Sequence, residues 1–162
     1  MPRPKTLPDL DVLKAAYALM HERGPEALSF ANVGEACGLS ASTLVQRFKT
    51  KDKLVQATLL HAWDRLDAKT AALSAKAAKT PTGAIKLLAG LSRSYGGIEA
   101  YANGLLVLRE DVRDPTLRAR GTAWKAALAK ALDACFAATP RKPRDVGLLL
   151  ATHWQGSLLW WS

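Results

Sequence analysis

The fold is decided by residues 29–54, SFANVGEACGLSASTLVQRFKTKDKL, which predict two short helices, a glycine turn between them and a basic exit. Ser29 is suited to cap a helix over Phe30–Cys37, because its hydroxyl accepts from first-turn N–H groups that have no other partner. Gly38 ends this helix, since glycine readily adopts the positive φ that is common just past a helix terminus. A second helix then runs over Ala41–Phe48. This order predicts a helix-turn-helix.

The second helix, capped by Ser40, has an inner and an outer face. Leu44 and Phe48 lie four residues apart and are expected to face the protein. The outer residues are small at the helix start, which lets the helix approach base edges in a major groove, while Thr43 and the basic side chains are expected to meet phosphates. The candidate DNA-binding residues are Ala41, Ser42, Thr43, Val45, Gln46, Arg47, Lys49, Lys51 and Lys53.

Residues 12–54 resemble the N-terminal domain of the tetracycline-repressor-like (TetR) transcriptional regulators. The resemblance rests on three spaced segments, VLKAAYALMHERG, LSFANVGEACGLSASTL and RFKTKDKL, the last where the family typically reads HF-x-S/N-K-E/D-x-L. It implies base-facing roles for Ala41, Ser42 and Val45, and phosphate-facing roles for Thr43, Arg47 and Lys51.

The chain departs from the family pattern at two positions. Val45 stands where the family usually has tyrosine, so an apolar contact, such as one to a thymine methyl, replaces a phenolic hydroxyl. Phe30 stands where a polar residue is common, which removes a candidate phosphate contact from the start of the first helix of the motif.

Composition indicates a folded, all-helical protein, since 49% of the 162 residues are hydrophobic, only 7% are aromatic and strand patterns are nearly absent. The formal net charge of +9 favours a polyanionic partner such as nucleic acid. Residues 1–54, however, hold eight basic and six acidic side chains, so most of the excess lies in the rest of the chain. These additional basic side chains either lie on solvated surface or attract an acidic ligand.

Three segments are predicted along the chain: a basic flexible arm (1–8), a three-helix helix-turn-helix domain (9–54), and a helical effector-binding and dimerisation domain (55–162). The basic arm, MPRPKT, is of a kind that supplements DNA contacts in a groove. Helical periodicity and Pro or Gly punctuation predict the later helices. Their expected bounds are 51–79, 82–95, 98–112, 115–138 and 144–162.

The last helix is apolar nearly all round from Val146 to Trp161, which favours a subunit interface. The resemblance implies that the last two helices form a four-helix homodimer bundle, and that a small-molecule pocket lies among the helices after the head. Aromatic and amphipathic side chains line most ligand cavities, although each one taken singly is more often packing. The candidate lining residues are His61, Trp63, Tyr95, Tyr101, Trp124 and Trp154.

The sequence thus predicts a dimeric repressor that binds double-stranded DNA at a palindromic operator and is released by a small-molecule effector. The alternative is a DNA-binding protein of the same fold that acts constitutively or through a partner, without an effector. An enzyme is disfavoured, since three separated histidines accompany no nucleophile motif or glycine-rich phosphate loop.

Neither a metal nor a cofactor is expected. Cys37 and Cys135 have no metal-ligand partner at useful spacing and are predicted to be buried small hydrophobic residues. No apolar run suggests a signal peptide or a membrane helix, so we expect a soluble, cytoplasmic protein with no membrane partner.

Overall fold

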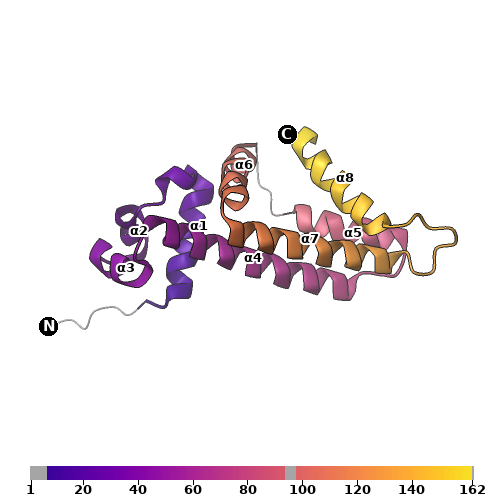
Figure 1. Cartoon of the computed structure of the whole chain (residues 1–162), viewed down its shortest axis with the longest axis horizontal. Coiled ribbons are helices and arrows are strands. Elements are labelled where there is room, and N and C mark those ends of the chain that lie inside the picture. Colours follow the sequence, from indigo (N-terminus) through magenta and orange to yellow (C-terminus); the bar gives the residue numbers. More distant parts are fainter. Residues whose placement is uncertain (1–6, 94–97, 162) are drawn as a thin grey trace. The chain divides into compact units, whose positions relative to one another are not determined.

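The structure, a computed structural model, describes residues 7–93 and 98–161, apart from the side chains at positions 98, 100, 159 and 161. Its described part contains α-helices and one 3-10 turn, with no strand, so the predicted all-α class is confirmed (Figure 1). The elements are α1 (Asp9–Arg23), a 3-10 turn (Pro25–Ala27), α2 (Phe30–Cys37), α3 (Ala41–Phe48), α4 (Lys51–Lys76), α5 (Pro81–Ser92), α6 (Ile98–Arg113), α7 (Pro115–Cys135) and α8 (Val146–Trp161).

The chain divides into two compact units. The first unit comprises Met1–Trp63 and Glu99–Arg118, and the second comprises Asp64–Ile98 and Ala119–Ser162. The first unit therefore contains α6 in addition to α1, α2, α3 and the first half of α4. The second unit contains the rest of α4, together with α5, α8 and most of α7.

One buried apolar cluster holds the first unit together. Each of its helices contributes to the cluster: Val12, Ala16, Leu19 and Met20 from α1, Val33 from α2, Leu44 and Phe48 from α3, Leu54 and Leu59 from α4, Val107 from α6 and Leu117 from α7, with Leu28 from the connection before α2. Burying a side chain of this size stabilises a fold by roughly 1.5–3 kcal/mol relative to leaving it exposed. Because buried side chains of α1 and α3 belong to the same cluster, the packing holds α3 in place and leaves its outer face exposed.

Polar contacts attach α6 and the start of α7 to the same unit. The Asn103 amide donates to the backbone oxygen of His21 at 2.9 Å, at the carbonyl-rich end of α1. The Gln56 amide donates to Asp114 at 2.7 Å, and the Trp63 indole N–H donates to Asp111 at 3.0 Å. These contacts hold the α6–α7 turn against α4.

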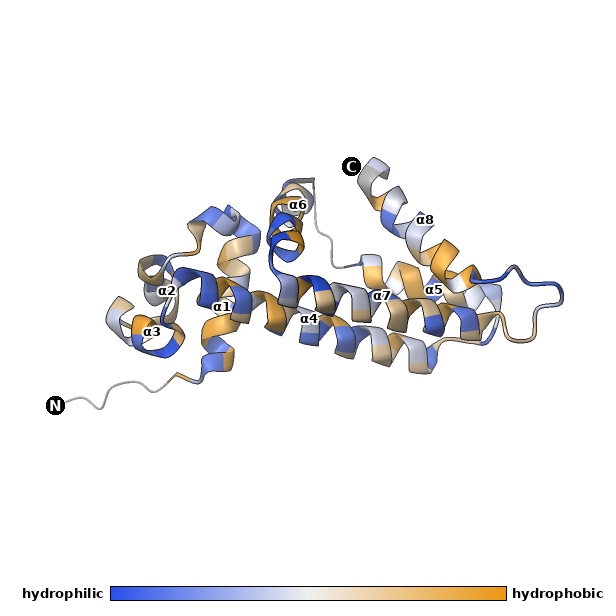
Figure 2. Cartoon of the chain, viewed as in Figure 1, coloured by the Kyte–Doolittle hydropathy of each residue, from blue (hydrophilic) through white to orange (hydrophobic). Residues whose placement is uncertain are grey.

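Interhelical hydrogen bonds and ion pairs organise the second unit. The Arg120 guanidinium of α7 bridges two carboxylates of α4, at 2.6 Å from Asp64 and 2.8 Å from Asp67. On α8, the backbone N–H of Gly147 donates to the Asp133 carboxylate of α7 at 2.9 Å. Figure 2 shows α5 as mainly apolar and the connection between α7 and α8 as hydrophilic, which agrees with the buried Leu87, Leu88 and Leu91 of α5.

Four helix bounds differ from the sequence-based expectation. α5 ends at Ser92, not near 95. α4 ends at Lys76, not near 79, because the chain turns back so tightly that a Cβ at Gly83 would collide with the backbone of Ala78. α7 ends at Cys135, after which the Phe136 N–H bonds three residues back, in a turn. α8 begins at Val146, because Asp145 has a φ of 54° and cannot be helical.

Candidate nucleic-acid interface

The helix-turn-helix forms through contacts that are local in sequence. The Ser29 hydroxyl accepts from the N–H of Asn32 at 3.1 Å, which caps α2 as predicted. Gly38 follows α2 with a φ of 69°, and the N–H of Leu39 donates to the oxygen of Gly34 at 2.9 Å. The turn between α2 and α3 is therefore fixed by one residue in the left-handed region and one backbone hydrogen bond.

Gly34 allows the close approach within this turn. A Cβ built on Gly34 would lie 2.6 Å from the backbone oxygen of Leu39, closer than any ordinary contact. Because that oxygen belongs to the backbone of the turn, the turn itself would have to move to accept a side chain.

The faces of α3 are divided as the sequence predicts. Leu44 is fully buried and Phe48 is 9% exposed, both within the cluster of the first unit. Ala41, Ser42, Val45 and Gln46 are exposed, and Thr43 is half-buried. The N-terminal end of α3 therefore presents short side chains, some apolar and some polar. A surface of this kind can approach the floor of a DNA groove closely.

Ser40 has a role beyond the cap that the sequence indicates. Its hydroxyl accepts from the N–H of Thr43 at 3.2 Å and also lies 2.9 Å from the Ser42 hydroxyl and 2.8 Å from the Thr43 hydroxyl. Ser40 therefore orients two of the candidate DNA-binding side chains. The sequence offers one indication of this role, since Ser40, Ser42 and Thr43 place three hydroxyl groups within four positions at the start of α3.

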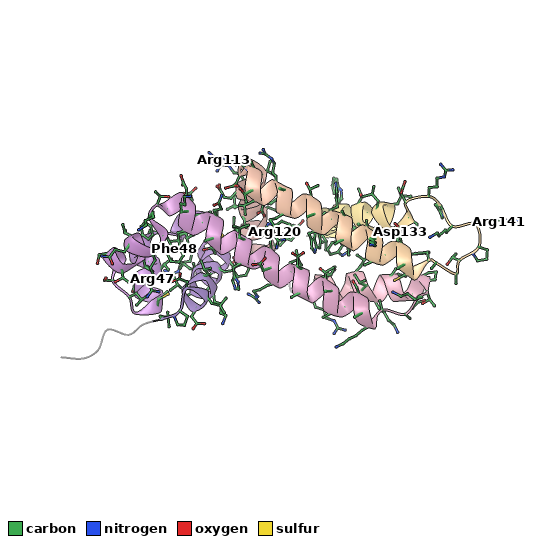
Figure 3. The ribbon with its side chains drawn as sticks, turned by 60° about the horizontal axis from the view of Figure 1, so that its bottom comes forward. Arg47, Phe48, Arg113, Arg120, Asp133 and Arg141 are labelled. Carbon is green, nitrogen blue, oxygen red and sulfur yellow. The ribbon has the colours of Figure 1, made fainter. Side chains whose placement is uncertain are left out.

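Arg47 is placed differently from the other candidate phosphate contacts. Its Nη1 donates to the backbone oxygen of Leu7 at 2.6 Å and to the Asp9 carboxylate at 3.1 Å, and its side chain is 22% exposed. Figure 3 labels Arg47 and Phe48 next to each other in the first unit. The guanidinium is therefore engaged within the chain, by partners about forty positions away that local sequence patterns do not reveal.

The basic exit from α3 is open to solvent. Lys49, Lys51 and Lys53 are all exposed. Thr50 begins α4 as predicted, since its hydroxyl accepts from the N–H of Lys53 at 3.2 Å. Three lysines within five residues, next to the exposed end of a candidate recognition helix, are suited to bind phosphates.

The candidate effector-binding residues fall into separate groups. His61, Trp63 and Tyr101 belong to the first unit, and Trp124 and Trp154 belong to the second. The sixth, Tyr95, lies outside the described residues. Within the second unit, the structure brings Trp124 and Trp154 together.

The two tryptophans of the second unit take part in packing. Their ring centroids are 6.5 Å apart, with the rings tilted by 51°. The Trp124 indole N–H donates to the Thr70 hydroxyl at 2.9 Å, and that of Trp154 donates to the Ser92 hydroxyl at the same distance. The indole N–H groups of the half-buried Trp124 and the buried Trp154 therefore both have partners inside the protein.

His61 differs from these tryptophans. Its Nε2 atom is shielded from solvent and has no hydrogen-bond partner among the described residues. A buried polar atom without a partner is costly and calls for an explanation, such as a water molecule or a ligand.

Burial and hydrogen bonding shift three side-chain pKa values. Cys135 is buried as predicted, whereas Cys37 is only half-buried. Desolvation raises the pKa of the Cys37 thiol. Burial raises the pKa of Asp111, against the opposing hydrogen bond from Trp63. The hydrogen bond from Gln56 is the main cause of a lowered pKa at Asp114.

Neither a metal site nor a membrane helix has a candidate in the described part of the chain. The described residues contain no group of three or more His, Cys, Asp or Glu side chains placed to hold a metal ion. None of the helices in the described ranges is long and apolar enough to cross a membrane.

Comparison with known families agrees with this geometry. Residues 12–58 match the family model described as bacterial regulatory proteins, tetR family. The matched segment contains α2, α3 and the basic exit, so the similarity to the tetR family lies in the helix-turn-helix. The resemblance predicted from the sequence is confirmed. The comparison with curated proteins found no match.

Solved structures extend the similarity to the whole fold. The TetR-family regulator PfmR from Thermus thermophilus is 20% identical with a TM-score of 0.68, over 96% of this chain and 84% of that one. A regulator from Saccharomonospora viridis in complex with choline is 19% identical with a TM-score of 0.69, over 90% and 78%. AibR, in complex with isovaleryl coenzyme A and operator DNA, is 18% identical with a TM-score of 0.67, over 93% and 83%. At these identities the likeness shows a shared fold.

Proposed function

We propose that this protein is a sequence-specific transcriptional regulator that binds a palindromic operator as a homodimer, represses transcription and is released by a small-molecule effector. The observation that carries the proposal is the exposed outer face of α3, with Ser42 and Val45 at its open end and Lys49, Lys51 and Lys53 directly after it. The fold similarity to AibR, whose structure contains operator DNA, supports it.

The proposed homodimer forms through α7 and α8. Three large apolar side chains of α8 are exposed in the single chain: Leu148 at 42%, Leu149 at 59% and Trp160 at 88%. Apolar side chains exposed to this extent along one helix favour burial against a second subunit. A two-fold dimer also matches a palindromic DNA site, since each half-site then meets one recognition helix.

The proposed effector site includes His61, whose shielded Nε2 lacks a partner among the described residues. The second unit carries twelve basic and four acidic residues, whereas the first carries eleven and ten. His61 belongs to the nearly neutral first unit, but the whole chain has a formal net charge of +9, which favours an anionic effector over a cationic one. Isovaleryl coenzyme A, the compound bound by AibR, is therefore the first probe, and choline, bound by the S. viridis regulator, is the matched control.

The proposed role is regulatory and not enzymatic, and we place the protein in the cytoplasm, where its DNA target lies. A regulator of the same fold without an effector is the second candidate. The shielded Nε2 of His61 favours the ligand-responsive form, because an unsatisfied buried nitrogen gives a ligand a hydrogen bond to make.

The test is a selection of random duplex DNA by the purified protein, followed by titration of the enriched sequence across salt concentrations. We expect a palindrome with half-sites about one helical turn, roughly 34 Å, apart. Ser42→Ala and Val45→Ala should change which sequence is preferred, whereas Lys51→Gln should weaken binding to all sequences and reduce the salt slope by about 0.9.

Each outcome has a distinct meaning. No enriched sequence, with binding that depends only on salt, would refute sequence-specific regulation. Enrichment without release by isovaleryl coenzyme A would count against the anionic effector and leave the DNA-binding role in place.

A further inference from the structure

Four helices of the second unit share one end. The Arg120 guanidinium of α7 lies 2.6 Å from the Asp64 carboxylate of α4. Further along both helices, the Trp124 indole N–H of α7 donates to the Thr70 hydroxyl of α4 at 2.9 Å. α4 and α7 therefore run in the same direction, so their C-terminal ends lie at the same end of the unit.

The N-terminal ends of α5 and α8 lie there as well. α5 returns along α4, since the Lys69 ammonium of α4 donates at 3.1 Å to the backbone oxygen of Leu91, near the C-terminal end of α5. α8 starts on the last turn of α7, where the N–H of Gly147 donates to the Asp133 carboxylate at 2.9 Å. The α4–α5 and α7–α8 connections therefore lie at the same end of the second unit (Figure 1).

These two connections are strongly basic. Together with adjoining helix residues they span 76–81 and 137–145, which we call the basic end. The basic end contains five basic side chains and one acidic side chain, all exposed: Lys76, Lys79, Arg141, Lys142, Arg144 and Asp145. Figure 3 labels Arg141 at this end of the unit. Positive charge is therefore concentrated where the two connections lie.

The five cations of the basic end are available to another molecule. None of them forms an ion pair with a residue in the described part of the chain. Arg120, on the same unit, is instead held by Asp64 and Asp67. Unpaired cations on a surface favour a polyanionic partner, and with DNA their binding releases condensed counterions.

The neutral residues of the basic end limit which polyanion it fits. They are alanine, threonine and proline only. Single-stranded nucleic acid is bound largely through aromatic side chains that stack on its bases. Membrane surfaces are bound by segments that also insert large apolar side chains. Duplex DNA needs neither, since its phosphates alone supply sequence-independent binding.

We propose that the basic end is a second DNA-binding surface, which binds the phosphate backbone of duplex DNA without reading its sequence. It lies in the second unit, whereas the helix-turn-helix belongs to the first. A protein with both surfaces binds duplex DNA even where α3 meets no matching sequence. This surface accounts for the position of most of the positive charge outside the unit that contains α3.

The test starts from a head variant, Lys49→Gln/Lys51→Gln/Lys53→Gln, which removes the lysines that follow α3. Its affinity for a labelled random-sequence duplex is measured by fluorescence anisotropy against salt concentration. The end variant adds Lys79→Gln/Lys142→Gln to this protein. Each phosphate contact contributes about 0.9 to the salt slope, so we expect the head variant to retain binding and the end variant to lose a further 1.8 or so, about 0.9 for each lysine.

The matched control adds Arg93→Gln/Lys125→Gln to the head variant instead. Both side chains are exposed on the second unit but lie outside the basic end, so the control removes the same charge. It should keep the salt slope of the head variant. Equal losses in the end variant and the control would mean that only overall charge matters, and would overturn the inference. A head variant that binds no duplex would overturn it as well.

Vesicles of phosphatidylglycerol test the alternative partner. If the end variant sediments less with these vesicles than the head variant does, while the two bind duplex DNA equally, the basic end binds a membrane surface and the choice of DNA is wrong.

The inference and the proposed function fail separately. A protein that enriches no sequence refutes sequence-specific regulation, and the loss in the end variant is still expected. An enriched palindrome, with equal salt slopes in the end variant and the control, refutes the second surface alone.

Discussion

Lys49 occupies a strained backbone position between the recognition helix and α4. Its φ is 68° and its ψ is −57°, and the N–H of Thr50 donates to the oxygen of Phe48 at 2.8 Å. These values describe a γ-turn of the rare, strained hand, which residues with a Cβ seldom adopt. The side chain is also exposed at the proposed DNA face. Lys49→Gly should therefore stabilise the protein while weakening its binding to DNA.

The magnitude follows from two opposing terms. A residue held in a sparsely populated backbone region costs of order 1–3 kcal/mol. Glycine relieves this strain but loses roughly 0.5–1 kcal/mol through its greater freedom in the unfolded chain. The centres of these two ranges give an expected net gain in the free energy of unfolding of about 1 kcal/mol.

Lys49→Ala separates the backbone effect from the loss of the ammonium group, because alanine removes the charge and keeps the strain. In urea unfolding, Lys49→Gly should be more stable than Lys49→Ala by about 1 kcal/mol. Both variants should lose about 0.9 from the salt slope of DNA binding. If Lys49→Gly is no more stable than Lys49→Ala, the backbone at Lys49 is not strained. If the salt slope of DNA binding is unchanged in both variants, Lys49 does not contact a phosphate.

Three other substitutions test individual contacts within the two units. Gly34→Ala should lower the free energy of unfolding in urea by roughly 1–3 kcal/mol, because the new Cβ would lie 2.6 Å from the Leu39 backbone oxygen. An unchanged urea midpoint of unfolding would mean that the turn moves to accept the methyl group. Burial raises the pKa of Asp111 from 3.8, so its folded form holds a proton more tightly than the unfolded chain, and stability falls as the pH rises from 3.8 through the raised value. Asp111→Asn should therefore be more stable than wild type at pH 7, with the difference vanishing below about pH 3.8 in acid titrations; a constant difference would contradict this. Trp154→Phe removes an indole N–H that donates to a hydroxyl in the second unit, and thermal unfolding should show a loss of about 1 kcal/mol, whereas an unchanged midpoint would mean that the bond is not formed.

The helix-turn-helix was predictable because its determinants act over a few residues. Ser29, Gly38 and Ser40 each form their deciding contact or conformation within four positions of themselves. The alternation of buried Leu44 and Phe48 with exposed neighbours follows directly from helical periodicity. Sequence reasoning therefore located the helices of the motif and their outer face.

Contacts between distant segments were not predictable in this way. Asn103 binds the backbone of His21, 82 positions away, and Arg47 binds Leu7, 40 positions away. Neither pair leaves a periodic or local signal, because the partner atom in each is a backbone oxygen that any residue would offer. The interpretation of Arg47 as a phosphate contact followed from its residue type and position on α3, and tertiary structure gives it other partners.

The charge distribution limits how the first unit can bind DNA. With eleven basic and ten acidic residues it is nearly neutral, although it contains the helix-turn-helix. Its affinity for DNA therefore depends on where its basic side chains lie, and three exposed lysines, Lys49, Lys51 and Lys53, directly follow α3. At about 0.9 per phosphate, three such contacts predict a salt slope of roughly 2.7 for each subunit. A steeper measured slope would require the basic second unit to reach the DNA as well.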